Sequence, residues 1–79
     1  MKTISDKQAQ ELADDFDVFI ACDKDGSVFA FDHKPVARKC EWVNNIEGFG
    51  GVFQLPVNLI SNREFKDRLW TPLNRKTQG

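Results

Sequence analysis

Apolar and polar positions along the chain predict one helix near the N-terminus, followed by several strands. In residues 5–16 the apolar residues recur at spacings of three and four, which is typical of an amphipathic helix with one buried face. Ser5, three residues before Gln8, forms the pattern of a capping box at the start of such a helix. The expected apolar stripe consists of Ala9, Leu12, Ala13 and Phe16.

Two apolar segments follow, "DVFIACD" (17–23) and "SVFAFDH" (27–33), and their Val, Ile and Phe content predicts strands. The first is apolar at every position from Val18 to Cys22. This indicates a central strand covered on both faces, or a strand covered by the helix on one face and by a partner on the other.

The segment D-K-D-G-S (23–27) between these strands admits two interpretations, a calcium loop or a hairpin turn. An EF-hand loop needs an oxygen ligand at its first position and Gly at its sixth. Placing Gly26 sixth puts Ala21 first, and placing Asp23 first puts Val28 sixth, so both registers fail. Because D-G between apolar segments favours a tight turn, we predict a hairpin.

The second half of the chain predicts two more strands and a short helix. "ARKCEWVNN" (37–45) is expected to be a strand with Cys40 and Trp42 on one face, and a glycine-rich loop follows it. In "GVFQLPVNLI" (51–60), Pro56 indicates an edge strand or an early strand end. Ser61 and Glu64 have the spacing of a second capping box, which predicts a short helix ended by Pro72.

Together these elements predict an α+β fold. An N-terminal helix would pack on a small, mainly antiparallel sheet of three or four strands, and a short C-terminal helix would close the chain. Residues 1–73 are expected to form a single compact domain, and 74–79 a flexible tail.

Composition places the chain among small globular domains. Its 79 residues include seven Phe and two Trp, which supply much of the buried area that so short a chain needs. No apolar segment is long enough for a membrane span, and the N-terminus lacks the apolar core of a signal peptide, so we expect a cytoplasmic protein with no membrane partner.

Two cysteines and one histidine fall short of a zinc site without carboxylates, so we expect free thiols, no metal and no cofactor.

Charge is unevenly distributed, although the net charge is only −1. Residues 1–32 hold three lysines against eight acidic residues, a net charge of −5, and residues 33–79 hold eight basic residues against four acidic ones, a net charge of +4. Either the two halves attract each other within the fold, or the basic half meets an anionic partner.

Catalytic patterns are weak. Cys22 and His33 are a conceivable pair, but a cysteine inside an apolar strand is usually inert. The "GFGG" segment (48–51) lacks the Gly-Lys-Ser/Thr of a phosphate-binding loop. We therefore expect no catalytic residues and a protein that is not an enzyme.

Basic and aromatic residues are interleaved near the C-terminus, at Arg63, Lys66, Arg68 and Trp70. On the predicted helix, Lys66 and Trp70 would share a face, which suits stacking of bases beside phosphates. The alternative is that Trp70 packs in the core while the charges face water.

One segment resembles a known class of proteins. The pattern D-x-D-G-S-V-x-x-F (23–31), followed by Lys34-Pro35 and then Trp42, resembles a hairpin found in small uncharacterised phage and prophage proteins. The resemblance implies an accessory protein of a bacterial host cell that acts by binding.

These observations lead to two functional hypotheses, beside a third and weaker one, an enzyme that acts through Cys22 or through the clustered carboxylates Asp14, Asp15 and Asp17. The first is a non-enzymatic module that binds a bacterial or phage protein as an inhibitor or adaptor, for example against a host defence system, and that forms homo-oligomers through a sheet edge. The second is binding of nucleic acid or a nucleotide by the C-terminal basic and aromatic segment. The predicted partner-binding residues are Lys34, Trp42, Arg63, Lys66, Arg68 and Trp70.

Overall fold

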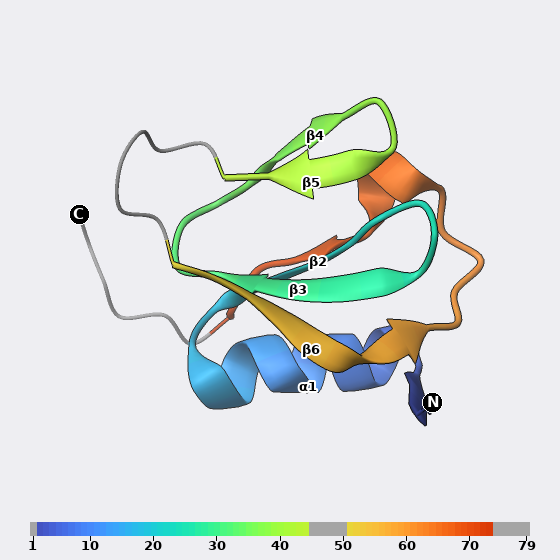
Figure 1. Cartoon of the computed structure of the whole chain (residues 1–79). Coiled ribbons are helices and arrows are strands. Elements are labelled where there is room, and N and C mark those ends of the chain that lie inside the picture. Colours follow the sequence, from blue (N-terminus) through green and yellow to red (C-terminus); the bar gives the residue numbers. More distant parts are fainter. Residues whose placement is uncertain (1, 45–50, 74–79) are drawn as a thin grey trace.

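The computed structural model describes residues 2–44 and 51–73. Figure 1 shows the main sheet between α1 on one side and the β4–β5 hairpin on the other. The elements are, in chain order, β1 (Lys2–Ile4), α1 (Asp6–Phe16), β2 (Phe19–Cys22), β3 (Ser27–Phe31), β4 (Val36–Arg38), β5 (Glu41–Val43), β6 (Val52–Leu59), the 3₁₀ turn η1 (Phe65–Asp67) and β7 (Leu69–Trp70).

The main sheet corrects the predicted fold class. It has five strands in the order β1-β6-β3-β2-β7 and is mixed, because β1 runs parallel to β6 while the other pairs are antiparallel. β4 and β5 form a separate two-stranded sheet. The described residues are therefore mostly β, with one α-helix, and the predicted three- or four-stranded sheet with a second helix is wrong.

The N-terminal helix is confirmed together with its cap. The Gln8 backbone N–H donates to Ser5 Oγ at 3.3 Å, and the Ser5 backbone N–H donates to Gln8 Oε1 at 2.9 Å. Asp17 adopts a left-handed conformation (φ 54°) after Phe16, and its backbone N–H donates to the carbonyl of Ala13. The helix therefore ends in an αL cap. With its 11 residues it is too short to cross a membrane, and no other described helix could do so.

The D-K-D-G-S segment forms the predicted hairpin turn between β2 and β3. The Gly26 backbone N–H donates to Asp23 O at 3.0 Å, and Gly26 has a φ of 98°, which favours glycine. The Ser27 backbone N–H donates to Asp25 Oδ1 at 2.9 Å, so Asp25 stabilises the turn through its side chain.

The strand predicted over residues 37–45 is two strands joined by a turn. Lys39 adopts a φ of 48°, which reverses the chain between β4 and β5. Cys40 therefore lies exposed in the turn, and only Trp42 is buried on the inner side of the hairpin. The sequence does not predict this turn because no Gly or Pro marks it and Cys40, Glu41 and Trp42 alternate as in a strand.

β6 continues through Pro56, contrary to the predicted early end. Ser27 pairs with Asn58 and Phe29 pairs with Gln54, so three residues of β6 face the single residue Val28 of β3. Pro56 lies in this bulge, where the ladder is interrupted and the missing N–H costs little. β6 is second in the strand order, and β1 pairs only with its residues 57–59, so the edge-strand interpretation fails for the end of β6 and not for its first half.

The predicted C-terminal helix is absent. Ser61 Oγ accepts a hydrogen bond from the Arg63 backbone N–H in a local turn, and Glu64 precedes η1 without a side-chain cap. Only one 3₁₀ turn forms, and the next two residues pair with β2 as β7, Leu69 with Ala21 and Trp70 with Ile20. Residues 45–50 of the predicted loop and the predicted tail over 74–79 lie outside the described residues.

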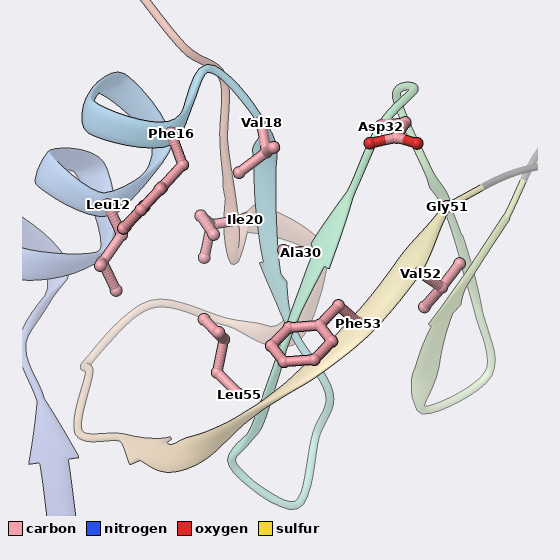
Figure 2. Close-up of a pocket in the computed structure, with 10 residues that line it drawn as sticks. All are labelled: Leu12, Phe16, Val18, Ile20, Ala30, Asp32, Gly51, Val52, Phe53 and Leu55. Carbon is pink, nitrogen blue, oxygen red and sulfur yellow. The ribbon is translucent and has the colours of Figure 1, made fainter.

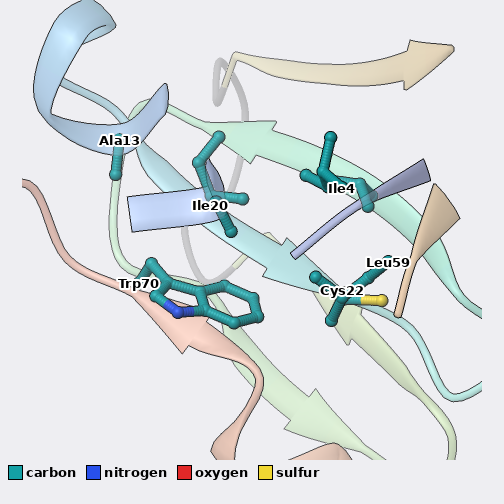
Figure 3. Packing of buried hydrophobic residues seen from close by; sticks show 8 residues of the cluster. Ile4, Ala13, Ile20, Cys22, Leu59 and Trp70 are labelled. Atoms are coloured by element: carbon teal, nitrogen blue, oxygen red, sulfur yellow. The ribbon is translucent and has the colours of Figure 1, made fainter. Parts of the chain in front are cut away.

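The sheet buries apolar side chains on both faces. Figure 3 shows the core on the helix side, where Trp70 lies beside Ile20, Cys22 and Ala13. On the other face Ala21 and Phe31 pack with Trp42. β2 is thus covered on both faces by elements of its own chain, which selects the first of the two interpretations of its apolar sequence.

Replacing Ser5 with Ala should lower the free energy of unfolding by about 1 kcal/mol, because it removes the α1 cap. Urea denaturation followed by circular dichroism measures this loss. Ser61→Ala is the matched control, since Ser61 caps no helix, and its cost should be less than half as large. Equal costs would indicate a second capped helix.

Candidate functional site

The helix covers only part of its face of the sheet. α1 packs mainly against β2, with further contacts to β1 and β7. Beside it lies a groove of about 400 Å³. Figure 2 shows Leu12 and Phe16 projecting from α1 on one side of it and Phe53 and Leu55 from β6 on the other. Its lining residues are Leu12, Phe16, Val18, Ile20, Ala30, Asp32, Gly51, Val52, Phe53 and Leu55.

Two phenylalanines stand at the groove with most of their surface in solvent. Phe16 is 68% exposed and Phe53 is 65% exposed. Phe16 is the last helical residue, and it lines the groove together with Ile20 of β2. Phe53 pairs with Ala30 of β3, which places both on the helix side of the sheet. An open apolar surface of this kind is a candidate site of interaction.

One end of the groove carries a carboxylate. The Asp32 backbone N–H donates to Gly51 O at 3.1 Å, and a Cβ at Gly51 would collide with the Asp32 side chain. Asp32 is the one charged residue among those that line the groove in the described part of the chain. Asp15 and Asp17, both exposed, flank Phe16 in sequence. One acidic residue therefore lines the apolar groove, and two more are sequence neighbours of a lining residue.

The two tryptophans predicted to bind a partner belong to the core instead. Trp42 is 9% exposed and its ring lies 5.7 Å from that of Phe65, and Trp70 is 3% exposed. Trp42 Nε1 is buried without a hydrogen-bond partner among the described residues. The indole faces are thus covered by the protein, so the core-packing interpretation of Trp70 holds.

Arg63 and Arg68 have intramolecular contacts. The Arg63 guanidinium lies 5.2 Å from the ring centroid of Trp70 and 3.7 Å from the Asp6 carboxylate. Arg68 Nε donates to Arg63 O at 3.0 Å, and Arg68 Nη1 lies 3.5 Å from Asp23 O. These contacts join the basic C-terminal segment to the acidic N-terminal half.

Lys34 and Lys66 are exposed, and the fold does not bring them to one site with the tryptophans. Lys34 lies between β3 and β4, whereas Lys66 lies in η1. The expected sharing of a helix face by Lys66 and Trp70 is wrong because Trp70 belongs to β7.

A second hollow of about 370 Å³ lies beside the hairpin turn and is lined by Asp23, Lys24, Asp25, Cys40 and Glu41. The Trp42 backbone N–H donates to Asp23 Oδ1 at 2.9 Å, yet burial raises the pKa of Asp23 overall. The hydrogen bond from Ser27 lowers the pKa of Asp25.

No group of three His, Cys, Asp or Glu side chains in residues 2–44 and 51–73 could hold a metal ion.

Both cysteines are free thiols in different environments. Cys22 is fully buried and its Sγ donates to Asp23 O at 3.3 Å, whereas Cys40 is exposed. Burial raises the pKa of the Cys22 thiol, and the Arg68 guanidinium offsets part of that rise. Cys22 thus has the properties of a structural thiol.

No protein-family model, curated protein or solved structure matches this chain. The resemblance of the hairpin to phage and prophage proteins therefore stays a prediction. The apolar groove is the most distinctive surface of the described residues.

The groove residues carry little signal in the sequence. The spacing of apolar residues places Phe16 on the buried stripe of α1, and only its position at the very end of the helix indicates exposure. The position of Phe53 depends on which strand pairs with β6 and on the length of α1, and both are properties of the tertiary structure.

Arg63→Ala should lower the free energy of unfolding by about 1 kcal/mol, because it removes a cation–π contact and an exposed ion pair. Lys66→Ala is the matched control and should change the free energy of unfolding by less than about 0.5 kcal/mol. Urea denaturation of both variants tests this. Equal effects would contradict a structural role for Arg63.

Iodoacetamide at pH 8 should label one thiol of the native protein quickly and the other slowly. Cys40 is exposed, whereas Cys22 is buried and its raised pKa keeps it protonated at this pH. Mass spectrometry of digested samples assigns each label, and both cysteines should react at similar rates in urea. Rapid labelling of native Cys22 would reopen its candidacy as a nucleophile.

Proposed function

We propose that this protein acts without catalysis, by binding another protein through the apolar groove between α1 and β6. The supporting observation is the pair of exposed phenylalanines, Phe16 and Phe53, on either side of a groove whose lining is otherwise almost entirely uncharged. Such a module would serve as an inhibitor or adaptor.

Burial of these side chains would supply affinity. Each phenylalanine that passes from water into an apolar contact contributes roughly 1.5–3 kcal/mol. A groove of about 400 Å³ is within the size range of small-molecule sites, but such sites enclose most of their ligand. Because Phe16 and Phe53 leave this groove open, it suits large side chains that project from a macromolecular surface.

Charge favours a partner segment that is both apolar and basic. Asp32 lies at the groove, Asp15 and Asp17 flank Phe16, and residues 1–32 carry a net charge of −5. A cationic amphipathic segment would place apolar side chains in the groove and Lys or Arg side chains near these carboxylates. Association should therefore weaken as salt concentration rises.

Nucleic-acid binding by the C-terminal segment receives less support. Stacking of bases requires exposed aromatic faces, whereas Trp70 is buried and one of its faces meets Arg63. Arg68 donates to the backbone of Arg63. These contacts favour the protein-binding hypothesis over the alternative.

A photo-crosslinking amino acid placed at position 16 should capture a specific partner from a bacterial lysate, the source suggested by the hairpin resemblance. The same amino acid at Ile60, which is equally exposed but outside the groove, is the matched control. The protein captured at position 16 should be lost when Phe53→Ser is added and retained when Leu73→Ser is added. Mass spectrometry identifies it.

Capture that is equal at positions 16 and 60, or that survives Phe53→Ser, would contradict the proposal. Nile red supplies an independent measurement because its fluorescence reports apolar surface. Phe16→Ser should abolish most of the dye signal, and Ile60→Ser should leave it nearly unchanged. Equal loss in the two variants would remove the groove from consideration.

A further inference from the structure

Hydrogen bonds at the two ends of β6 show which of its residues direct their backbone N–H and C=O groups away from β3. At the start, Gly51 O accepts from the Asp32 backbone N–H, so Gly51 faces β3. At the end, the Ile60 backbone N–H donates to Ile4 O, so Ile60 faces β1. Because successive residues of a strand direct their backbone groups to opposite sides, Val52 and Gln54 face outward, away from β3.

β1 provides hydrogen-bond partners only for the C-terminal end of the outer side of β6. It pairs with residues 57–59 of β6, and Figure 1 shows it beside the arrowhead of that strand. Pro56 has no N–H to offer. No described segment pairs with the outward groups of Val52 and Gln54, so residues 52–55 form an open strand edge.

This open edge lacks the charged side chains that proteins use to discourage edge pairing. Its residues are Val, Phe, Gln and Leu, and Pro56 limits its length. Phe53, at its centre, is 65% exposed. The edge therefore combines backbone groups that lack a described partner with an apolar side chain that is exposed to solvent.

We propose that two copies of this chain pair through this edge, β6 against β6, as antiparallel strands about a two-fold axis at Phe53. Val52 would lie opposite Gln54 of the second copy, and each such pair would exchange two hydrogen bonds. The outward N–H and C=O groups of both residues are then satisfied in both copies by the same short segment.

The register favours a second copy over an unrelated strand because the edge is complementary to itself. With the axis at Phe53, the two Phe53 residues form a non-hydrogen-bonded pair, whose Cα atoms lie about 4.5 Å apart in antiparallel sheets. Both rings are on the helix side, so each covers the other. Such aromatic cross-strand pairs stabilise sheets.

The pairing extends the proposed function without depending on it. It would join the two five-stranded sheets into one continuous sheet and bring the two grooves to the same face. A partner could then engage two grooves at once, which raises avidity. Phe53 would contribute both to its own groove and to the junction between the grooves.

Cysteine crosslinking tests the register directly. In a Cys40→Ser background, Phe53→Cys would place two thiols across the axis at a separation that suits a disulfide. Under mild oxidation most of this variant should become covalent dimer. Ile60→Cys is the matched control, because Ile60 is as exposed as Phe53 but faces β1, and it should yield little dimer.

Sedimentation equilibrium tests the unmodified protein, which should show twice the mass of the 9.0 kDa chain. Gln54→Pro removes an outward N–H without touching a bond to β3 and should restore the single-chain mass, whereas Gln54→Val keeps the N–H and should remain dimeric. Circular dichroism checks that both variants fold. If Gln54→Pro unfolds, the crosslinking comparison decides.

A single-chain mass of the unmodified protein at all concentrations would overturn the proposal, and so would equal crosslinking of Phe53→Cys and Ile60→Cys. A dimer that survives in folded Gln54→Pro would place the interface elsewhere and also overturn it. These outcomes are independent of partner capture at position 16, so the failure of one proposal is distinguishable from the failure of the other.

Discussion

A sheet with two apolar faces is the constraint on which the rest of this structure depends. β2 buries Ile20 on the helix side and Ala21 on the other, so its stability requires cover on both sides. The described residues form one α-helix, α1, which covers one face of the main sheet. The β4–β5 hairpin and η1 cover the other face, with Trp42 against Phe65 as their contact. Arg63 then joins this C-terminal segment to α1 through Asp6 and to β7 through Trp70.

The local elements were predictable from the sequence, and the elements that depend on tertiary contacts were not. The Ser5–Gln8 capping box and the turn at Gly26 each draw their hydrogen bonds from residues within three positions, so their sequence patterns describe them fully. Ser61 and Glu64 have the same spacing as a capping box, yet only the single 3₁₀ turn η1 follows them and no α-helix. An extended segment places Leu69 and Trp70 on opposite faces of the sheet, where each fills a different core cluster. Long-range burial therefore overrides the local preference for a helix.

The candidate binding residues illustrate the same limit. Interleaved basic and aromatic residues are typical of nucleic-acid binding, but here the pattern arises because Trp70 fills the core and Arg63 lies over its ring. In a chain of 79 residues the large aromatic side chains are needed for burial, so an aromatic residue beside an arginine is weak evidence for a ligand. The groove, in contrast, brings together residues from α1, β2, β3 and β6, and no local pattern could join them.

The groove and the open strand edge have a common origin in the short length of two N-terminal elements. The 11 residues of α1 span about 16 Å, whereas the eight residues of β6 extend about 26 Å. A helix about 10 Å wide that crosses such a sheet leaves part of its face uncovered. β1 has three residues and pairs with fewer than half of the residues of β6, so part of that strand's outer side also lacks a described partner. Both deficits meet at Phe53, which lines the groove and lies at the centre of the open edge. Phe53 would therefore gain burial from a partner in the groove and also from a second copy at the edge, although neither association requires the other.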